Sequence, residues 1–199
     1  MIALIDYRAG NLTSVKKALA AIGAEVFVPI QPQDLATARG IIVPGVGHFG
    51  ATRALDSTWV DAIRGRLHEG CLLLGICLGM QWLYESSDEA PDLTGLGALE
   101  GRVVRLRADE GIKIPHVGWN SLTLVRDASI VAGVAPGAQV YFTHSYVAPL
   151  TADTAAVTEH GEPFAAIVQR GPIAGVQFHP EKSGDVGLRI LRNFVGWTE

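Results

Sequence analysis

The sequence of 199 residues predicts an α/β fold, in which a central mixed, mostly parallel sheet is flanked by helices. Short apolar runs rich in Val and Ile alternate with helical patterns in the first half of the chain, and strand follows strand in the second half. Hydrophobic residues make up 48% of the chain and charged residues 18%, which is enough apolar material for a core. At roughly 100–200 residues per domain, the length predicts a single domain over residues 1–199.

The first half is expected to alternate strands and helices. Apolar side chains recur at helical spacing from residue 12 to 22 and predict a helix capped by Gly23. Further helical patterns lie near Leu35 and over residues 59–67. Short apolar runs predict strands at 2–5, 25–28, 40–43 and 71–74.

The second half is expected to add antiparallel strands that extend the central sheet. A last helix is predicted from Leu188, Leu191 and Val195, which fall on one helical face. Apolar runs predict strands at 102–106, 119–125, 139–143, 155–158, 164–168 and 173–178.

Composition and charge exclude several classes of function. A formal net charge of −4 without a Lys/Arg run argues against nucleic acid and anionic membranes as partners. The start of the chain has no signal-peptide pattern, and no apolar run reaches the roughly 18 residues that a membrane span needs. Two cysteines, Cys71 and Cys77, are too few for a disulfide scaffold, so we expect a reduced, cytoplasmic protein.

The most specific motif is LGICLGMQ, residues 74–81, which follows an apolar strand and precedes a helical pattern. It has the form G-x-nucleophile-x-G, in which the nucleophile sits on a tight strand-to-helix turn. Cys77 would then lie at a helix N-terminus that favours its thiolate form, and the Leu78 N–H would point at a developing oxyanion. The alternative is a buried structural cysteine beside packing glycines; Cys71, inside the strand, is expected to be a core residue.

A thiolate nucleophile needs a base and a group that orients the base. The segment GVQFHPEK, residues 175–182, supplies both at the end of the last predicted strand. Pro180 favours extended geometry at His179, and residues i and i+2 of an extended segment share a face. Glu181 can therefore bond one imidazole nitrogen of His179 while the other faces the thiol. Taken alone, the motif also fits a surface histidine beside an unrelated acid.

A glycine-rich loop, PGVGHFG at residues 44–50, follows the predicted strand 40–43. Sites in open α/β sheets lie at the carboxyl ends of strands, so its N–H groups can face a ligand. We expect the Gly47 N–H to be the second oxyanion donor. An ordinary glycine-rich turn is the alternative, and no G-x-x-x-x-G-K-[ST] pattern supports a phosphate loop.

Together, GICLGMQ, PGVG and QFHPEK resemble the class I, or triad, glutamine amidotransferases. DYRAGN (6–11), PGVGHFG, IPHVGWN (114–120), YFTHSY (141–146) and GVQFHPEKS (175–183) are similar to the glutaminase subunits of imidazole glycerol phosphate synthases, and the matches extend from residue 6 past residue 190. The sequence departs from that pattern at Arg8 and His48, at Trp82, and after Tyr146, where a second aromatic is missing. None of these departures touches the triad, but Arg8 and His48 lie in loops near the expected site.

The resemblance implies a three-layer fold and the hydrolysis of L-glutamine to glutamate and ammonia in histidine biosynthesis. Cys77 would form a thioester, with His179 and Glu181 completing the triad. Leu78 and Gly47 would hold the oxyanion. It places Gln81, Ser145 and Tyr146 around the backbone groups of glutamine, where ordinary packing is the alternative.

The resemblance also implies a partner, because ammonia released into water is mostly ammonium and a poor nucleophile. The partner is the cyclase subunit, a (β/α)8 barrel that would form a heterodimer with this chain. It would add ammonia to an N-phosphoribulosyl aminoimidazole carboxamide ribonucleotide, giving imidazole glycerol phosphate and aminoimidazole carboxamide ribotide. The interface residues implied are Asn11, Trp119, Tyr141 and Lys182; from the residues alone, Trp119 and Tyr141 read as core strand residues and Lys182 as solvated.

No cofactor is expected, and the remaining histidines lack metal-ligand spacing. Three other functions stay open at this point: the glutaminase of another synthase, a regulatory module without activity, and a stand-alone cysteine hydrolase. The mobile-looking PGVG loop suggests weak glutaminase activity until the cyclase and its ligand bind.

Overall fold

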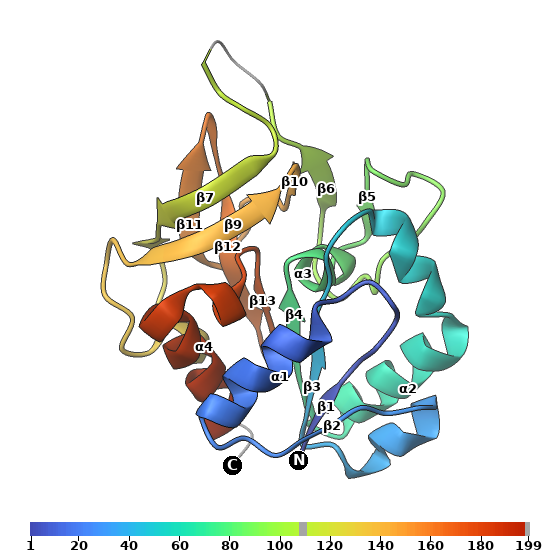
Figure 1. The fold of residues 1–199 in the computed structure, drawn as a ribbon. Helices are drawn as coiled ribbons and strands as arrows, with labels where there is room; N and C mark the ends of the chain where they lie inside the picture. Colours follow the sequence, from blue (N-terminus) through green and yellow to red (C-terminus); the bar gives the residue numbers. More distant parts are fainter. Residues whose placement is uncertain (108–110, 198–199) are drawn as a thin grey trace.

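The structure is a computed structural model that describes residues 1–107 and 111–197. Within these residues, eight strands form a central sheet in the order β2-β1-β3-β4-β13-β12-β11-β8 (Figure 1). Their bounds are β1 Ile2–Leu4, β2 Val26–Phe27, β3 Gly40–Val43, β4 Leu72–Ile76, β8 Thr123–Leu124, β11 Thr154–His160, β12 Glu162–Arg170 and β13 Ile173–Val176.

The sheet is mixed and mostly parallel, as predicted. All neighbouring pairs from β2 to β13 are parallel, and the pairs of β13 with β12, β12 with β11 and β11 with β8 are antiparallel. In register, Gly75 of β4 lies between Val43 of β3 and Gly175 of β13. The chain segments that follow these three neighbouring strands therefore meet at one edge of the sheet.

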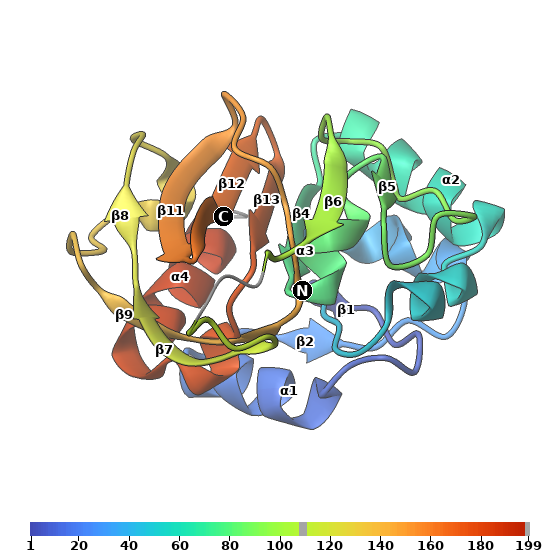
Figure 2. The same cartoon turned by 90° about the horizontal axis from the view of Figure 1, so that it is seen from above.

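Helices cover both faces of the sheet, which confirms the three-layer arrangement (Figure 2). Helices α1 (Leu12–Ala21) and α4 (Gly184–Trp197) pack on one face, and α2 (Ser57–His68) and α3 (Leu78–Trp82) on the other. Successive side chains of a strand point to opposite faces of the sheet. Ile2 and Leu4 therefore pack in the core under α1 and α4, whereas Ala3 and Ile5 pack in the core under α2 and α3.

Capping residues set the helix ends. The side chain of Asn11 accepts a hydrogen bond from the Ser14 N–H at the start of α1, and Gly23 beyond its end has a φ of +77°. Asp56 caps α2, which explains why this helix begins two residues before the predicted range. The helix expected near Leu35 is a 3-10 helix. The four 3-10 helices of the described chain are η1 Pro32–Thr37, η2 Phe49–Ala54, η3 Ser129–Val131 and η4 Pro180–Lys182.

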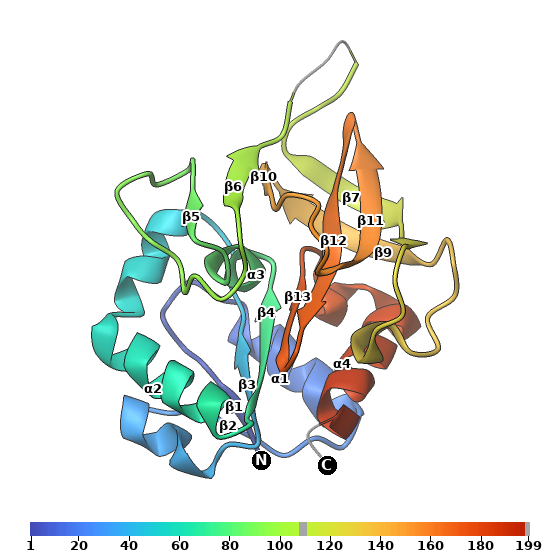
Figure 3. The ribbon, with the colours of Figure 1, turned by 180° about the vertical axis from the view of Figure 1, so that it is seen from behind.

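Three of the predicted strands do not extend the central sheet, so that expectation was wrong for 102–106, for most of 119–125 and for 139–143. Strands β5 (Ser86–Ser87), β6 (Arg102–Arg105) and β10 (Tyr146–Val147) form one small sheet, and β7 (His116–Ser121) pairs with β9 (Gln139–His144) in another (Figure 3). The central parallel strands β1, β3, β4 and β13 are buried on both faces, whereas β6, β7 and β9 each have exposed side chains. A strand with one exposed face does not need two covering layers.

Candidate active site

Cys77 sits on the tight turn between β4 and α3, with φ of +52° and ψ of −107°. A non-glycine residue in this region is strained, and the strain is held in place by close backbone packing. A Cβ atom at Gly79 would lie 1.8 Å from the Val43 carbonyl oxygen, and one at Gly75 would lie 2.6 Å from the Gly79 backbone. Gly79 is therefore required by the approach of the turn to β3, and Gly75 by its approach to the backbone at the start of α3.

His179 and Glu181 lie together at the end of β13, as expected from their spacing. His179 Nδ1 is 2.9 Å from Glu181 Oε1, and both side chains are 2% exposed. The backbone of His179 is also held in place, because its N–H donates to the Tyr141 carbonyl and its carbonyl accepts from the Ser183 hydroxyl. Nε2 has no hydrogen-bond partner within the described residues, so this nitrogen is left for the thiol or a substrate.

Burial alone would lower the pKa of His179, but the side chains of Cys77 and Glu181 raise it to about 10. Both neighbours favour the charged imidazolium, one as a thiolate and the other as a carboxylate. The site therefore favours a protonated His179 beside Cys77. This is the protonation state that a proton donor to a leaving group needs.

Two groups next to the thiol were not found from the sequence. The carbonyl oxygen of Thr143 lies 3.8 Å from Cys77 Sγ, and Gln177 Nε2 donates toward Sγ at 3.6 Å. Gln177 precedes His179 by two residues, so the extended geometry that places His179 on this face also predicts Gln177 there. Thr143 contributes only its backbone, which no side-chain pattern reveals.

A cavity of about 200 Å³ opens beside Cys77. Gln81 Nε2 donates both to the Tyr146 carbonyl, at 3.0 Å, and to Gln177 Oε1, at 3.2 Å. These bonds join the motif on α3 to the cavity wall and to the strand that carries His179. The cavity is lined by Gly47, Cys77, Leu78, Gln81, Glu89, Pro115, Thr143, His144, Ser145 and Tyr146, which include all five residues expected at the oxyanion or around glutamine.

Glu89 is the carboxylate among these described lining residues, and no motif in the sequence points to it. Its Oε2 accepts a hydrogen bond from the Phe49 N–H at 2.6 Å. One carboxylate oxygen is thus engaged in holding the glycine-rich loop. Glu89 lies in an irregular segment with no motif around it, so only the folded chain places it at the cavity.

The glycine-rich loop is hydrogen-bonded on both sides at Gly45–Val46. The Leu78 N–H donates to the Gly45 carbonyl at 3.3 Å, and the Val46 N–H donates to the Ala9 carbonyl at 2.5 Å. Gly47 follows with a φ of +95° and lines the cavity. Arg8 and His48 are the two positions near this loop at which the sequence departs from the family pattern. Arg8 adopts a φ of +64°, and His48 Nδ1 accepts a hydrogen bond from the Gly50 N–H.

Three of the four expected interface residues form one aromatic cluster. Trp119 and Tyr141 meet edge to face with ring centres 6.0 Å apart, and Lys182 Nζ lies 5.7 Å from the centre of the Tyr141 ring. Trp119 is 57% exposed and Tyr141 is half-buried, so the interpretation of Trp119 as a core residue was wrong. Asn11 is exposed and caps α1.

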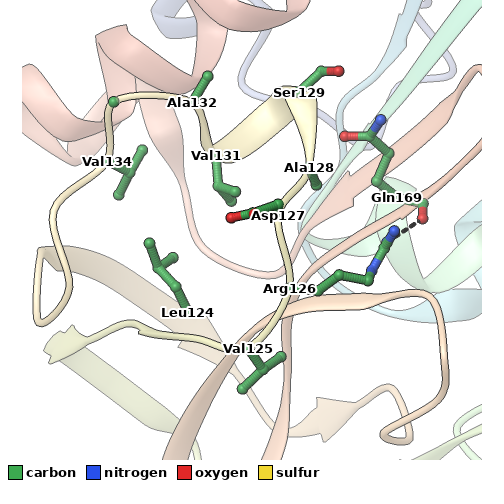
Figure 4. Close-up of a pocket in the computed structure, with 11 residues that line it drawn as sticks. Leu124, Val125, Arg126, Asp127, Ala128, Ser129, Val131, Ala132, Val134 and Gln169 are labelled. Atoms are coloured by element: carbon green, nitrogen blue, oxygen red, sulfur yellow. Dashed lines mark hydrogen bonds between the residues drawn. The ribbon is translucent and has the colours of Figure 1, made fainter.

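A larger hollow, of about 940 Å³, lies away from the triad along residues 124–134. Its lining in Figure 4 comes mostly from this one segment, with Arg126 donating to the Gln169 carbonyl. Its described lining contains no Cys or His side chain. Among the described residues, no group of three or more His, Cys, Asp or Glu side chains is placed to hold a metal ion. None of the described helices is long and apolar enough to cross a membrane.

Comparison with known families agrees with the observed fold. The model of the family described as glutamine amidotransferase class-I matches residues 3–196. The chain therefore belongs to the class-I glutamine amidotransferases.

Curated relatives narrow this class. The chain is 50% identical to the imidazole glycerol phosphate synthase subunit HisH of Gloeobacter violaceus, over 98% of this chain and 88% of the relative. It is 47% identical to HisH of Geobacillus kaustophilus, over 98% and 96%, and 43% identical to HisH of Methanothermobacter thermautotrophicus, over 98% of each. Within the class, the chain belongs to the HisH subunits of imidazole glycerol phosphate synthase, as the resemblance predicted.

Solved structures support the fold at lower identity. The chain is similar to a crystal structure of a glutamine amidotransferase, with a TM-score of 0.78, 23% identity and coverage of 100% of this chain and 99% of the other. A second similarity is to PurLQS from Thermotoga maritima, with a TM-score of 0.78, 19% identity and coverage of 100% and 98%. At these identities the likeness concerns the fold alone.

Proposed function

We propose that this chain is the glutaminase subunit of imidazole glycerol phosphate synthase and supplies ammonia for histidine biosynthesis. The observation that carries the proposal is the placement of Cys77 beside the buried His179–Glu181 pair at the mouth of a cavity large enough for an amino acid. The family to which the chain belongs supports the same reaction.

The first half-reaction transfers the acyl group to the chain. The Cys77 thiolate attacks the side-chain carboxamide carbon of glutamine, and the carbonyl electron pair moves onto oxygen. As that pair returns, the C–N bond breaks and His179 gives its Nε2 proton to the departing nitrogen. The products of this step are ammonia and a thioester on Cys77.

The second half-reaction uses water. His179, now neutral and oriented by Glu181, takes a proton from water while the hydroxide adds to the thioester carbon. Cleavage of the C–S bond then releases glutamate and restores the thiolate. The sum is glutamine and water giving glutamate and ammonia.

Binding of glutamine is assigned to the cavity walls. Glu89 offers a carboxylate to the α-ammonium group, since its other oxygen already accepts the Phe49 N–H. Ser145 and Tyr146 form a further part of the wall, and Gln81 of α3 donates a hydrogen bond to the Tyr146 carbonyl there. Leu78 and Gly47 N–H groups are proposed as the donors to the oxyanion.

The proposed donor at Leu78 is engaged by the Gly45 carbonyl in this structure. Stabilising an oxyanion there requires the Gly45–Val46 peptide to turn and release the Leu78 N–H. We therefore expect weak glutaminase activity from the chain alone and acceleration by a partner that favours the turned peptide. The partner proposed is the cyclase subunit, docked on the surface of Trp119, Tyr141 and Lys182, with Asn11 at its edge.

The test is glutamate release by the chain alone, with the cyclase, and with the cyclase and its ribonucleotide ligand. The proposal predicts slow release alone and the fastest release in the ternary mixture. Equal rates in all three would contradict coupled activation, and activation only by the synthase subunit of another pathway would contradict the assigned partner.

A further inference from the structure

Strands β7 and β9 form a two-stranded ribbon with two different faces. Its register pairs His116 with His144 and Trp119 with Tyr141. Trp119 points outward and is 57% exposed, whereas His116 and His144 point inward and are 3% and 6% exposed. The inward face also carries Asn120. Buried imidazoles directly behind the exposed aromatic surface are not explained by the triad.

The inward side chains form a continuous chain of hydrogen bonds. Asn120 Nδ2 is 3.3 Å from His116 Nε2, and His116 Nδ1 is 3.1 Å from His144 Nε2. His144 Nδ1 is 3.0 Å from the carbonyl oxygen of Tyr146, whose residue lines the cavity beside Cys77. The chain therefore runs from the ribbon to the wall of the proposed glutamine pocket.

The direction of every bond in this chain follows from its two ends. The Tyr146 carbonyl only accepts, so His144 carries its proton on Nδ1 and accepts at Nε2. His116 must then donate from Nδ1 and accept at Nε2, where Asn120 donates. The Asn120 amide orientation is set independently, because Oδ1 accepts from the Ser121 N–H at 2.8 Å and Nδ2 also donates to the Glu159 carbonyl at 2.9 Å.

This assignment needs both rings to be neutral. Burial lowers the pKa of His116 to about 4, with a smaller contribution from His160. Burial, aided by His116, lowers the pKa of His144 to about 3. A neutral imidazole accepts at one nitrogen and donates at the other, so the hydrogen bond on one side of each ring fixes the direction of the hydrogen bond on its other side.

The hydrogen bonds end at the Ser145–Tyr146 segment of the cavity wall, which two other hydrogen bonds also hold. The Tyr146 carbonyl also accepts from Gln81 Nε2, and the Ser145 carbonyl accepts from the Leu106 N–H at 2.9 Å. His144 adds the bond that comes from the ribbon. Packing alone does not require it, because His116 stacks on Phe142 and on His160, contacts that a phenyl ring would also make.

We propose that His116 and His144 are positioning residues, which hold the Ser145–Tyr146 wall in its glutamine-binding position and link it through Asn120 to the β7–β9 face. The inference rests on the proposed function, since it assigns the wall to glutamine. A shift of β7 on docking would reach the wall through three hydrogen bonds rather than through the thiol or His179.

The kinetic test replaces the ring and keeps its shape. His116→Phe retains the stacking but removes both hydrogen bonds of His116. His116→Gln offers one acceptor and one donor in place of the imidazole. In the complex with cyclase and ligand, we expect H116F to raise the KM for glutamine about fivefold, the effect of a lost hydrogen bond, with kcat for glutamate release nearly unchanged. H116Q should recover much of that loss, and synthesis driven by added ammonia should match the wild-type rate.

His160→Phe is the matched control. It makes the same substitution in a ring that stacks on His116, with ring centres 4.0 Å apart. His160 is not part of the series of hydrogen bonds from Asn120 to Tyr146. We expect H160F to keep the wild-type KM. A wild-type KM in H116F, or an equal rise in both variants, would overturn the proposal. The wild-type chain is measured first, and its failure to release glutamate with cyclase and ligand would instead count against the proposed function.

A second measurement does not depend on activity or on the variants folding. Nitrogen-15 spectra of the histidine rings in the wild-type chain at pH 7 should show neutral Nδ1–H tautomers for His116 and His144. His160 should instead carry a proton on Nε2, because this nitrogen faces the Lys113 carbonyl at 2.9 Å. An Nε2–H tautomer or a cationic ring at His116 or His144 would be incompatible with the proposed hydrogen bonds and would overturn the proposal.

Discussion

The backbone N–H of Leu78 donates a hydrogen bond to the carbonyl oxygen of Gly45, at a distance of 3.3 Å. The same peptide group presents its other end, the Val46 N–H, to the carbonyl of Ala9. The Gly45–Val46 peptide unit is thus held from both sides. Its carbonyl accepts from the Leu78 N–H, which the proposed mechanism needs as a donor to the oxyanion. In the proposed mechanism, this peptide must be released before the Leu78 N–H can stabilise the oxyanion.

Arg8 directly precedes Ala9, whose carbonyl holds this peptide, and has a φ of +64°. A side chain in the left-handed region costs about 1 kcal/mol relative to glycine. We expect Arg8→Gly to raise the free energy of unfolding by about 1 kcal/mol relative to Arg8→Ala, which retains the Cβ but also lacks the guanidinium. Urea unfolding of the two variants measures the difference. Equal stability would show that the backbone at this position is not strained.

The glycines around Cys77 provide a second stability test. Gly79→Ala would put a Cβ 1.8 Å from the Val43 carbonyl oxygen, so the turn and strand β3 must separate. We expect a loss of about 3 kcal/mol in the free energy of unfolding and loss of glutamate release.

Gly65→Ala in α2 is the matched control, because its Cβ would meet nothing within 4 Å. Alanine in that helix should stabilise the chain by about 0.5–1 kcal/mol. If G79A were as stable and active as G65A, the close approach at the turn would not be needed for the site.

The pKa of His179 predicts a dependence of stability on pH. A folded-state pKa raised to about 10 stabilises the protein fully below the unfolded value near 6.5, and this contribution is lost as the pH rises towards 10. We expect the free energy of unfolding to fall between pH 7 and 8.5 in the wild-type chain. Glu181→Gln removes one cause of the shift and should flatten that slope.

Urea unfolding of both chains at several pH values measures the two slopes. Cys71, whose pKa is raised by burial, is present in both chains, so its contribution cancels in the comparison. Parallel slopes would mean that Glu181 does not hold the proton on His179.

Glu89 is expected to act in binding rather than in chemistry. Glu89→Gln keeps an oxygen that can accept the Phe49 N–H but loses the charge offered to the α-ammonium group. We expect the KM for glutamine to rise about tenfold or more, the value of a charge-assisted hydrogen bond, with a smaller change in kcat.

Glu85→Gln is a suitable control, since Glu85 also accepts a backbone N–H, that of Gly101, but does not line the cavity. Steady-state glutamate release in the complex compares the two variants. An unchanged KM in E89Q would remove Glu89 from the glutamine site.

The sequence predicts those parts of the site that depend on local geometry. The G-x-Cys-x-G spacing places Cys77 on its turn because a side chain at Gly79 would meet β3, and the His-Pro-Glu order joins His179 to Glu181 within three residues. Both relationships are encoded within short segments. The parallel half of the central sheet followed for the same reason, from apolar runs buried on both faces.

Other parts depend on contacts between distant segments and were not predictable. Glu89 reaches the cavity through its bond to Phe49, 40 residues away. The direction of the Gly45 carbonyl depends on partners at Leu78 and Ala9, and either orientation is compatible with a glycine at that position. Strand β7 was expected in the central sheet because its apolar content does not reveal which strand it pairs with.

The central claim is that Cys77 releases ammonia that a partner consumes, and one measurement on the assembled complex tests it directly. Synthesis of imidazole glycerol phosphate by the cyclase with the Cys77→Ser chain is followed with glutamine and, separately, with added ammonia. The account predicts that the glutamine-driven reaction is lost and the ammonia-driven reaction continues at the wild-type rate. Undiminished glutamine-driven synthesis would contradict it.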